Sequence, residues 1–313
     1  MFSLLRNENM KLYARFQTWL MVLILLLAIG GIGFLDVYTK GSPDPAQWQS
    51  TVQQNTDVLQ TKLLQESDSG ARAQLEEQIK LNEYAMEHGI APDPYSMWSY
   101  TLMGAKLIPL VSIFVIVVAG GIVANEHAWG TVKNLLVKPY SRSKILLSKY
   151  MSVMQFALFL LLIVIAGTYL CKGIFYGFAP IQFHHLSVNG AGLVQDENMG
   201  LYVLKTYGLA SIELFFMATF AFMLSSMFRN QALAIGLGLI VQFTGSAITE
   251  TFLGQYSWLK YSLFSNTSLS MYWEGTPLLP DMTIGFSIAV LLAYYIVFMA
   301  MAWITFTKRD VAS

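Results

Sequence analysis

Six long apolar runs constrain this 313-residue chain more than any other feature of its sequence. Each run has about 20 residues, the length that a helix needs to cross the hydrocarbon core of a bilayer. Five of them contain no Asp, Glu, Lys or Arg, and the sixth contains only Glu213. The sequence therefore predicts that lipid surrounds most of the chain. The runs are Phe16–Leu35, Leu107–Ala124, Tyr150–Cys171, Thr206–Phe228, Asn230–Thr249 and Met282–Thr307.

The composition agrees with this interpretation, since 55% of the residues are hydrophobic and 12% are charged, against about 25% charged in soluble domains. A chain that crosses lipid must satisfy its backbone hydrogen bonds internally, and runs of this length do so as helices. We therefore predict an all-α, polytopic membrane protein with six transmembrane helices.

The positions of Lys and Arg near the ends of the runs predict the orientation. Basic residues favour the cytoplasmic side, and they gather there if both termini are cytoplasmic. The absence of an evident signal peptide and the single cysteine, Cys171, suit a multi-pass protein of a bacterial plasma membrane. The basic residues on the predicted inner side are Arg6, Lys11, Arg15, Lys133, Lys138, Arg142, Lys144, Lys149, Arg229, Lys308 and Arg309.

Four parts follow from this topology. Residues 1–16 read as an amphipathic helix at the membrane interface, or else as a charged flank of the first span, 16–37. Residues 38–105 predict an extracytoplasmic helical hairpin, because apolar residues recur there at helical spacing on both sides of Ser67–Gly70. Residues 106–313 hold five further spans. The stretch 44–93 has nine acidic and three basic residues, which form either a solvated face or a surface that attracts cations.

The sequence has none of the usual enzyme motifs. It lacks the phosphate-binding Gly-rich loop, the Gly-x-Ser-x-Gly nucleophile motif and the His-Glu-x-x-His zinc helix. We therefore predict no catalytic residues, no bound metal and no cofactor in this chain. Glu213 lies within a span, where a carboxyl is costly; it either lines a substrate or proton path or stabilises contacts between helices, and Gln242 is open to the same alternatives.

The segment between the second and third spans carries the strongest local signal. It combines apolar Trp129, Leu135 and Leu136 with several basic residues, and Pro139 ends one helix before Ser141 can cap the next. A short, rigid helix at the membrane edge is suited to docking a partner. The alternative is a basic anchor that only joins two spans on the inner side.

The pattern Glu126-x3-Gly130-Thr131-x3-Leu135-Leu136-x2-Pro139-x-Ser141-Arg142-x6-Lys149 resembles the signature of the ABC type-2 exporter permeases. The resemblance extends to the N-terminal helix, the order of six spans and the stretch from Tyr256 to Asn266. It implies a coupling helix at 125–142 that sits in a cleft of an ATPase subunit. The residues that it assigns to this coupling site are Glu126, Gly130, Thr131, Leu135, Leu136, Pro139, Ser141 and Arg142.

The resemblance implies a permease subunit of an ATP-driven exporter, with ATP and magnesium bound by a separate cytoplasmic ATPase. Two permeases, identical or related, would pair with two ATPases and expel an amphipathic or hydrophobic substrate: a peptide, an antibiotic or a lipid. The alternatives are a membrane-embedded sensor, immunity or scaffold subunit that binds a ligand without moving it, a channel or ion-coupled carrier, and an integral-membrane enzyme. Candidate residues of the pathway are Phe114, Glu213, Gln242 and Phe243.

Overall fold

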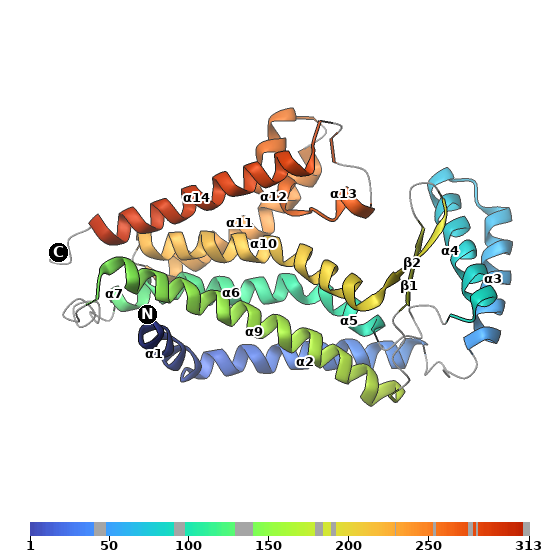
Figure 1. Cartoon of the computed structure of the whole chain (residues 1–313), viewed down its shortest axis with the longest axis horizontal. Coiled ribbons are helices and arrows are strands. Elements are labelled where there is room, and N and C mark those ends of the chain that lie inside the picture. The colour runs from blue at the N-terminus through green and yellow to red at the C-terminus, as the bar shows by residue number, and fades with distance from the viewer. Residues whose placement is uncertain are drawn as a thin grey trace. The chain divides into compact units, whose positions relative to one another are not determined.

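The structure is a computed structural model, and it describes residues 1–40, 48–90, 98–128, 140–178, 184–188, 192–228, 230–252, 255–274, 278–279 and 281–308. Most of these residues lie in helices (Figure 1). Six helices are long and apolar enough to cross a membrane, so the prediction of a mostly helical chain with six spans is confirmed. The spans are Phe16–Tyr38, Ser99–Glu126, Arg142–Tyr176, Met199–Phe228, Gln231–Thr249 and Ile284–Lys308.

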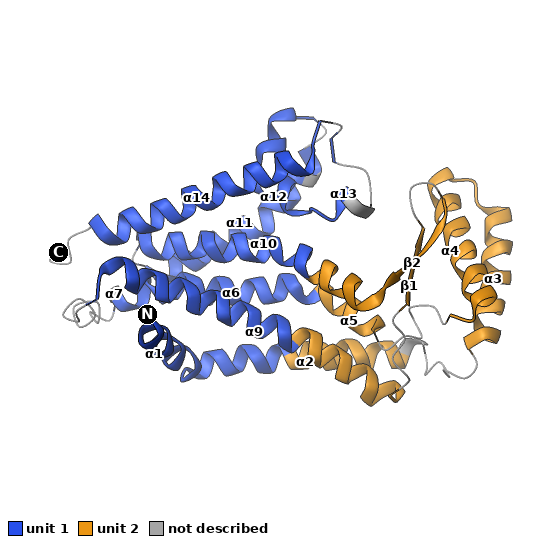
Figure 2. Cartoon of the chain, viewed as in Figure 1, with its two compact units in different colours: residues 1–25, 107–163, 208–313 blue, residues 26–106, 164–207 orange. Residues whose placement is uncertain are grey.

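The chain divides into two compact units, which Figure 2 colours separately. Unit 1 comprises residues 1–25, 107–163 and 208–313, and unit 2 comprises residues 26–106 and 164–207. The division falls within three long helices: α2 (Phe16–Lys40), α9 (Arg142–Tyr176) and α10 (Met199–Phe228). α9 and α10 are longer than the uncharged runs that predict them, because the helical backbone continues past the end of the apolar sequence.

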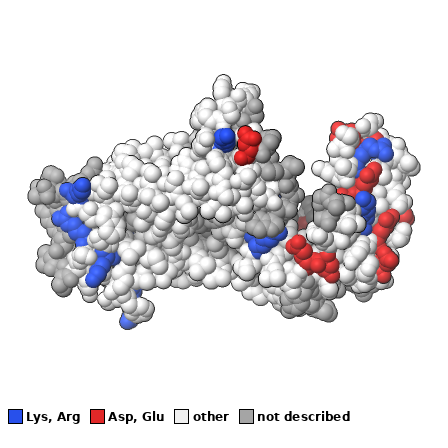
Figure 3. All heavy atoms as spheres, turned by 45° about the horizontal axis from the view of Figure 1, so that its top comes forward, with Lys and Arg blue, Asp and Glu red and all other residues white. Residues whose placement is uncertain are grey.

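Unit 1 holds most of the apolar core. Besides parts of the three long helices, its elements are α1 (Phe2–Tyr13), α6 (Ile108–Ile122), α7 (Ala124–Ala128), α11 (Gln231–Phe252), η4 (Ser257–Tyr261), α12 (Leu263–Thr267), α13 (Met271–Glu274) and α14 (Ile284–Lys308). α11 packs against α6 and α12, and α12 packs against α14. Figure 3 shows the spans of this unit as a broad surface without charge, with Lys and Arg gathered at the end that carries α7.

Glycine allows the close packing of α6 and α11. A Cβ atom on Gly120 of α6 would lie 2.8 Å from Cγ1 of Ile235, and one on Gly238 of α11 would lie 2.8 Å from Cγ2 of Ile116. Both distances are too short for a real side chain, so the two helices approach closely only because these positions lack one. Ala234, one turn before Gly238 on α11, is fully buried as well.

Unit 2 contains a pair of helices and a small sheet. α3 (Trp48–Gln65) packs against α4 (Ser69–His88) through Val52, Leu59 and Ile79, and the Thr56 hydroxyl accepts a hydrogen bond from Asn82 across the pair. Asp68 caps the N-terminus of α4 by accepting the Ala71 N–H at 2.9 Å. The unit also contains α5 (Ser99–Gly104) and the first two residues of η3 (Ala105–Leu107).

One part of the fold prediction is incomplete, because the chain is not entirely helical. β1 (His184–Val188) pairs antiparallel with β2 (Val194–Asn198), and both strands contact α4. His184 and His185 are neighbours on β1 and therefore point to opposite faces. His184 pairs with Asp196 at 2.7 Å, whereas His185 stacks on Tyr202.

Candidate functional site

A ring of two lysines and two glutamates lies within unit 1, where α1, α7 and α9 meet. The ammonium of Lys149 lies 2.7 Å from Oε2 of Glu8 and 2.7 Å from Oε1 of Glu126. The ammonium of Lys11 lies 3.0 Å from Oε1 of each glutamate. Each lysine therefore bridges both carboxylates, and the four formal charges cancel. We call these four residues the ion-pair ring.

The secondary structure explains how these side chains meet. Glu8 and Lys11 are three residues apart on α1 and so project from one face of that helix. Glu126 lies on α7, just after α6 ends, and Lys149 lies two turns into α9. The chain between α6 and α7 is held by α10, because the N–H groups of Val123 and Ala124 both donate to the Ser225 hydroxyl.

Three of the four side chains of the ring are buried, so the desolvation of their charges has to be compensated. The side chain of Lys149 is 0% exposed, and those of Glu8 and Glu126 are 6% and 9% exposed, whereas Lys11 is 41% exposed. Desolvating a charge costs several kcal/mol unless an opposite charge compensates for it. The ring meets this condition for its three buried members and leaves Lys11 at the edge that faces the surroundings.

The electrostatics of α1 follow from the same geometry. Burial by itself would raise the pKa of Glu8, but the ammonium groups of Lys149 and Lys11 outweigh it and lower that pKa. Burial would likewise lower the pKa of Lys11, but the carboxylates of Glu126 and Glu8 raise it. Both groups are thus held in their charged forms around neutral pH.

Glu126 of the ring lies near the start of the segment 125–142, and a second contact lies at the end of that segment. The guanidinium of Arg142, the first residue of α9, donates to the backbone carbonyl of Thr307 near the C-terminus of α14, at 3.0 Å. A cation at that place also suits the helix dipole of α14. Ser141 precedes α9, and its carbonyl accepts the N–H groups of Lys144 and Ile145.

The predicted coupling residues are therefore only partly placed. Glu126 and Arg142 contact other helices, and Ser141 lies at the start of α9. Gly130, Thr131, Leu135, Leu136 and Pro139 lie outside the described residues. Sequence reasoning missed the part played by Glu8. One signal could have found it, since Glu8 is an acidic residue in a flank that is otherwise basic.

The candidate pathway residues divide into two kinds. The amide of Gln242 on α11 accepts the Ser112 hydroxyl of α6 at 2.9 Å and donates to Oε1 of Glu213 on α10 at 2.7 Å. Three spans are thus joined by one polar chain. Phe114 is buried in α6, whereas Phe243 is 64% exposed on α11. The structure therefore brings Glu213 and Gln242 together.

Nothing in the described part of the chain forms a group of three or more His, Cys, Asp or Glu side chains able to hold a metal ion. The ion-pair ring offers instead a set of mutually compensated charges on three helices. Such a set resists separation of the helices, and it also responds to any displacement of one of them, because a charge that loses its partner inside the protein is costly.

Comparison with known proteins places the chain among its relatives. The family described as "Protein of unknown function (DUF2705)" matches residues 75–312. The chain belongs to the DUF2705 family. It is 37% identical over 315 residues to "Uncharacterized protein YhcI" of Bacillus subtilis (strain 168), with 100% of each chain covered. It is also 30% identical over 204 residues to "Uncharacterized membrane protein YdbK" of the same organism, which covers 64% of this chain and 78% of the relative.

These findings support a multi-pass membrane protein, and they overturn one prediction. The assignment to the ABC type-2 exporter permeases is wrong, since the family that matches most of this chain is DUF2705. The physical reason is that the motif is less specific than its length suggests. Any short connection on the inner side of a membrane favours basic residues, a proline at a helix end and a capping serine.

Proposed function

We propose that this DUF2705 protein is the permease subunit of an ATP-driven exporter, with ATP hydrolysed by a separate cytoplasmic ATPase. It works in the plasma membrane with both termini cytoplasmic, α1 along the inner surface and the α3–α4 pair outside. Two copies, or this chain and a related one, enclose the pathway. The exported substrate is amphipathic or hydrophobic.

The ion-pair ring is the observation that supports this proposal most directly. Its members flank the segment 129–139, with Glu126 before it and Lys149 after it. Lys11 joins Glu126 to α1, and Glu8 joins Lys149 to α1. Arg142 ties the far end of the same segment to α14. A force applied to this segment would therefore reach four helices at once through short polar contacts, as a coupling device requires.

The polar chain of Ser112, Gln242 and Glu213 gives the second argument. It connects α6, α11 and α10 within the spans, so movement of any one of these helices changes the surroundings of a carboxyl that is only partly buried. Intramembrane carboxyl groups usually face a partner or a cavity. We assign Glu213 and Gln242 to the wall of the pathway.

The coupling role has a direct test. Thr131→Cys, made in a Cys171→Ser background so that it is the only thiol, should crosslink to the proposed ATPase subunit when both are purified together. Gln54→Cys on the exposed face of α3 is the matched control and should give no such product. ATP-dependent transport by this chain without any ATPase would refute the proposal.

The ring has its own test, which separates coupling from folding. Replacing one bridged pair by Glu8→Met with Lys149→Met substitutes apolar residues of similar length for two charges, and buried ion pairs often tolerate this exchange. The double variant should fold and bind the ATPase but lose ATP-driven transport by at least about tenfold. Full transport by the double variant would reduce the ring to a structural contact.

A subunit that senses or retains a ligand without moving it is the competing function. The α3–α4 pair is the region that favours this competing function, because it offers a surface for ligands. Uptake into inverted vesicles distinguishes the two functions, because a sensor or scaffold accumulates no substrate whether or not ATP is present.

A further inference from the structure

In unit 1, α1 packs along the first half of α9. Three contacts join α1 to α9 or to the residue just before it, and they follow in the same order along both segments. α1 therefore runs beside α9 from the start of that helix toward its middle. The contacts are the hydroxyl oxygens of Ser3 and Tyr140, 3.4 Å apart, the hydrogen bond of 2.6 Å from the amide of Asn9 to Oε1 of Gln155, and the rings of Tyr13 and Phe159, edge to face with centroids 5.5 Å apart.

Arg6 adds a positive charge to this region of α1. It lies three residues before Asn9, so the two side chains project from the same side of the helix, and the side chain of Arg6 is exposed. Within the part of the chain that the structure describes, its guanidinium makes no ion pair. Glu8 and Glu126 do not compensate for it, because both are buried in the ion-pair ring and neutralised by its lysines.

The charge of the wider region has the same sign. The described segments 1–16, 123–128 and 140–150 hold six Lys or Arg and two acidic residues, and the two acidic residues are the buried glutamates of the ring. The face drawn in Figure 3 shows Lys and Arg, and no acidic side chain, at the end of unit 1 that carries α7. This end therefore attracts anions and repels a second cation.

Gln155 is an exposed amide on an apolar face of α9. Met151, Leu158 and Leu162 share this face by helical spacing and are 42%, 57% and 55% exposed. The carbonyl oxygen of Gln155 accepts the bond from Asn9, whereas its N–H groups make no hydrogen bond within the described residues. Because an amide donor without an acceptor is costly in hydrocarbon, this position favours a ligand that brings an acceptor into an apolar setting.

The order of these groups along α9 matches the order of groups in a phospholipid. Arg6 is nearest to the start of α9, Gln155 follows, and Leu162 lies seven residues, about 10 Å, further along the helix. A diacyl phospholipid carries its phosphate, its ester carbonyls and its acyl chains in the same order. A soluble anion would use Arg6 alone and leave the leucines uncovered. We call Arg6, Gln155, Leu158 and Leu162 the α1–α9 surface.

We propose that the α1–α9 surface binds an anionic phospholipid of the inner leaflet. The guanidinium of Arg6 pairs with the phosphate, the amide of Gln155 donates to an ester carbonyl, and an acyl chain lies over the two leucines. A zwitterionic lipid binds less well, because its choline brings a further cation to a basic region. The inference rests on the proposed function for the orientation of the chain. It names a partner of the ion-pair ring, since the lipid joins α9 to the helix that carries two of the four ring residues.

The test uses bimane attached to Ala166→Cys in a Cys171→Ser background. Ala166 is exposed one turn beyond Leu162 on the same face of α9. The full chain is placed in phosphatidylcholine nanodiscs that contain phosphatidylglycerol with brominated acyl chains, and bromine quenches bimane on contact. Quenching should saturate as the brominated fraction rises. The fraction that gives half of the maximal quenching should be about fivefold lower for brominated phosphatidylglycerol than for brominated phosphatidylcholine, the value of one cation beside an anionic lipid.

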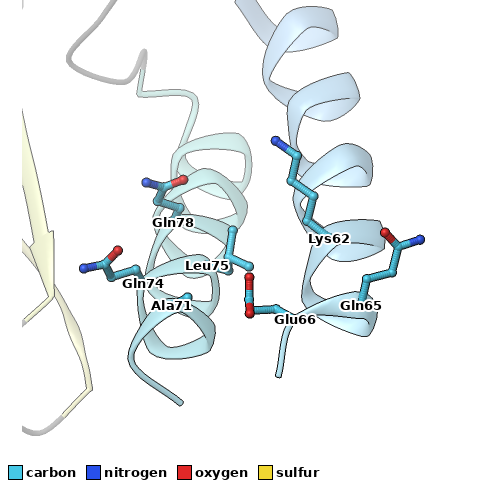
Figure 4. Close-up of a pocket in the computed structure, with 7 residues that line it drawn as sticks. All are labelled: Lys62, Gln65, Glu66, Ala71, Gln74, Leu75 and Gln78. Carbon is cyan, nitrogen blue, oxygen red and sulfur yellow. The ribbon is translucent and has the colours of Figure 1, made fainter. Parts of the chain in front are cut away.

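Arg6→Gln should raise the half-quenching fraction of phosphatidylglycerol about fivefold and leave that of phosphatidylcholine unchanged. Lys308→Gln is the control at the same end, since it removes an exposed cation from α14, which Figure 1 shows on the other side of unit 1 from α1. Lys62→Gln is the control in unit 2, where Lys62 lies beside a pocket between α3 and α4 (Figure 4). Each control should change the fraction less than twofold.

A conservative variant guards against misfolding of the first. Arg6→Lys keeps the charge and should keep at least half of the preference for phosphatidylglycerol. Equal quenching by the two lipids in the parent chain would overturn the proposal. Equal shifts in Arg6→Gln and Lys308→Gln would do so as well, because they would replace a site by a diffuse field. None of these measurements involves the ATPase, so a failed lipid test leaves the coupling test intact, and the reverse also holds.

Discussion

Two lysines on α9 are buried in different ways, one in each unit. Lys149 lies near the N-terminus of the helix and is held by carboxylates, at 2.7 Å from both Glu8 and Glu126. Lys172 lies near its C-terminus, is 5% exposed, and has its ammonium 4.0 Å from the ring centroid of Tyr176 and 5.0 Å from that of Tyr100. The same two tyrosines donate hydrogen bonds to Asp36, at 2.9 and 2.8 Å.

The difference teaches what each site can do. In the ion-pair ring three of the four ion pairs join formal charges on different helices, so its energy depends steeply on how those helices are placed. In the cluster of Asp36, Tyr100, Tyr176 and Lys172, two hydroxyl groups donate hydrogen bonds and two aromatic rings face the ammonium. Each of these interactions contributes a smaller free energy than an ion pair between buried charges. We interpret the ring as the site that responds to movement and the tyrosine cluster as an anchor.

The largest expected effect is that of Lys149→Met. The variant leaves the carboxylates of Glu8 and Glu126 buried with Lys11 as the remaining lysine of the ring, and breaking a buried pair typically costs about 3–5 kcal/mol. Denaturant titration in mixed micelles measures the loss. Lys144→Met, at an exposed position on the same helix, is the control and should cost less than about 0.5 kcal/mol. Similar losses in both would contradict a special role for the ring.

Lys172→Met should have a smaller effect. Methionine keeps most of the side-chain volume and the contact with the tyrosine rings, but it removes the cation–π attraction, about 2 kcal/mol for a desolvated site. The comparison between the two sites requires this loss to be smaller than that of Lys149→Met under the same conditions. The reverse order would show that the tyrosine cluster carries more electrostatic energy than its geometry indicates.

Tyr176→Phe should cost less again. It removes the hydroxyl that donates to Asp36 but keeps the ring beneath Lys172, and one hydrogen bond to a charged acceptor contributes about 1.5 kcal/mol. Tyr169→Phe, on the same helix, is the control. A loss as large as that of Lys172→Met would mean that the hydrogen bonds, and not the aromatic faces, dominate the cluster.

Changes of pH should give the smallest effect near neutrality. Because the pKa of Glu8 is lowered, its stabilising contribution is fully present above the ordinary value of about 4.3 and is lost as the pH falls through the lowered value. Because the pKa of Lys11 is raised, its contribution is present below about 10.4 and is lost as the pH rises through the raised value. The combined contribution of these two groups to stability should therefore be flat between about pH 5 and 10.

Glu8→Gln identifies the source of the acid-side loss. Between pH 5 and pH 3 the variant should lose less stability than the parent chain, because the titrating carboxyl is gone. An identical acid profile in both proteins would assign the loss to other carboxyl groups and remove Glu8 from the explanation.

The spans could be predicted from the sequence because their signal is local. A run of 20 residues without charge by itself indicates a segment that lies in lipid. The predicted runs and the observed helices overlap at all six places. The helices of 48–65 and 69–88 also show local spacing and an Asp cap at position 68. β1 and β2 carry no such signal, because their sequences are short and polar and they contact α4, which is distant in the chain.

The ion-pair ring could be predicted only in part from the sequence. Glu126 and Lys149 belong to the pattern that drew attention to the segment between the second and third spans, but their partners Glu8 and Lys11 precede them by more than 100 residues. No periodicity relates the two regions. The same holds for Gln242 and Glu213: the sequence indicates each of them separately as a polar residue within a span, and they are joined only in the folded chain.

The sequence by itself determined that this protein lies in a lipid bilayer, because the transfer of uncharged 20-residue runs into lipid depends on composition and length alone. Tertiary structure alone decided which charges became compensated, since pairing requires atoms within about 3 Å and that proximity arises from the packing of α1, α7 and α9. The family signature was misjudged for the same reason. A motif records local chemistry, whereas the part that a residue plays depends on its contacts with distant segments.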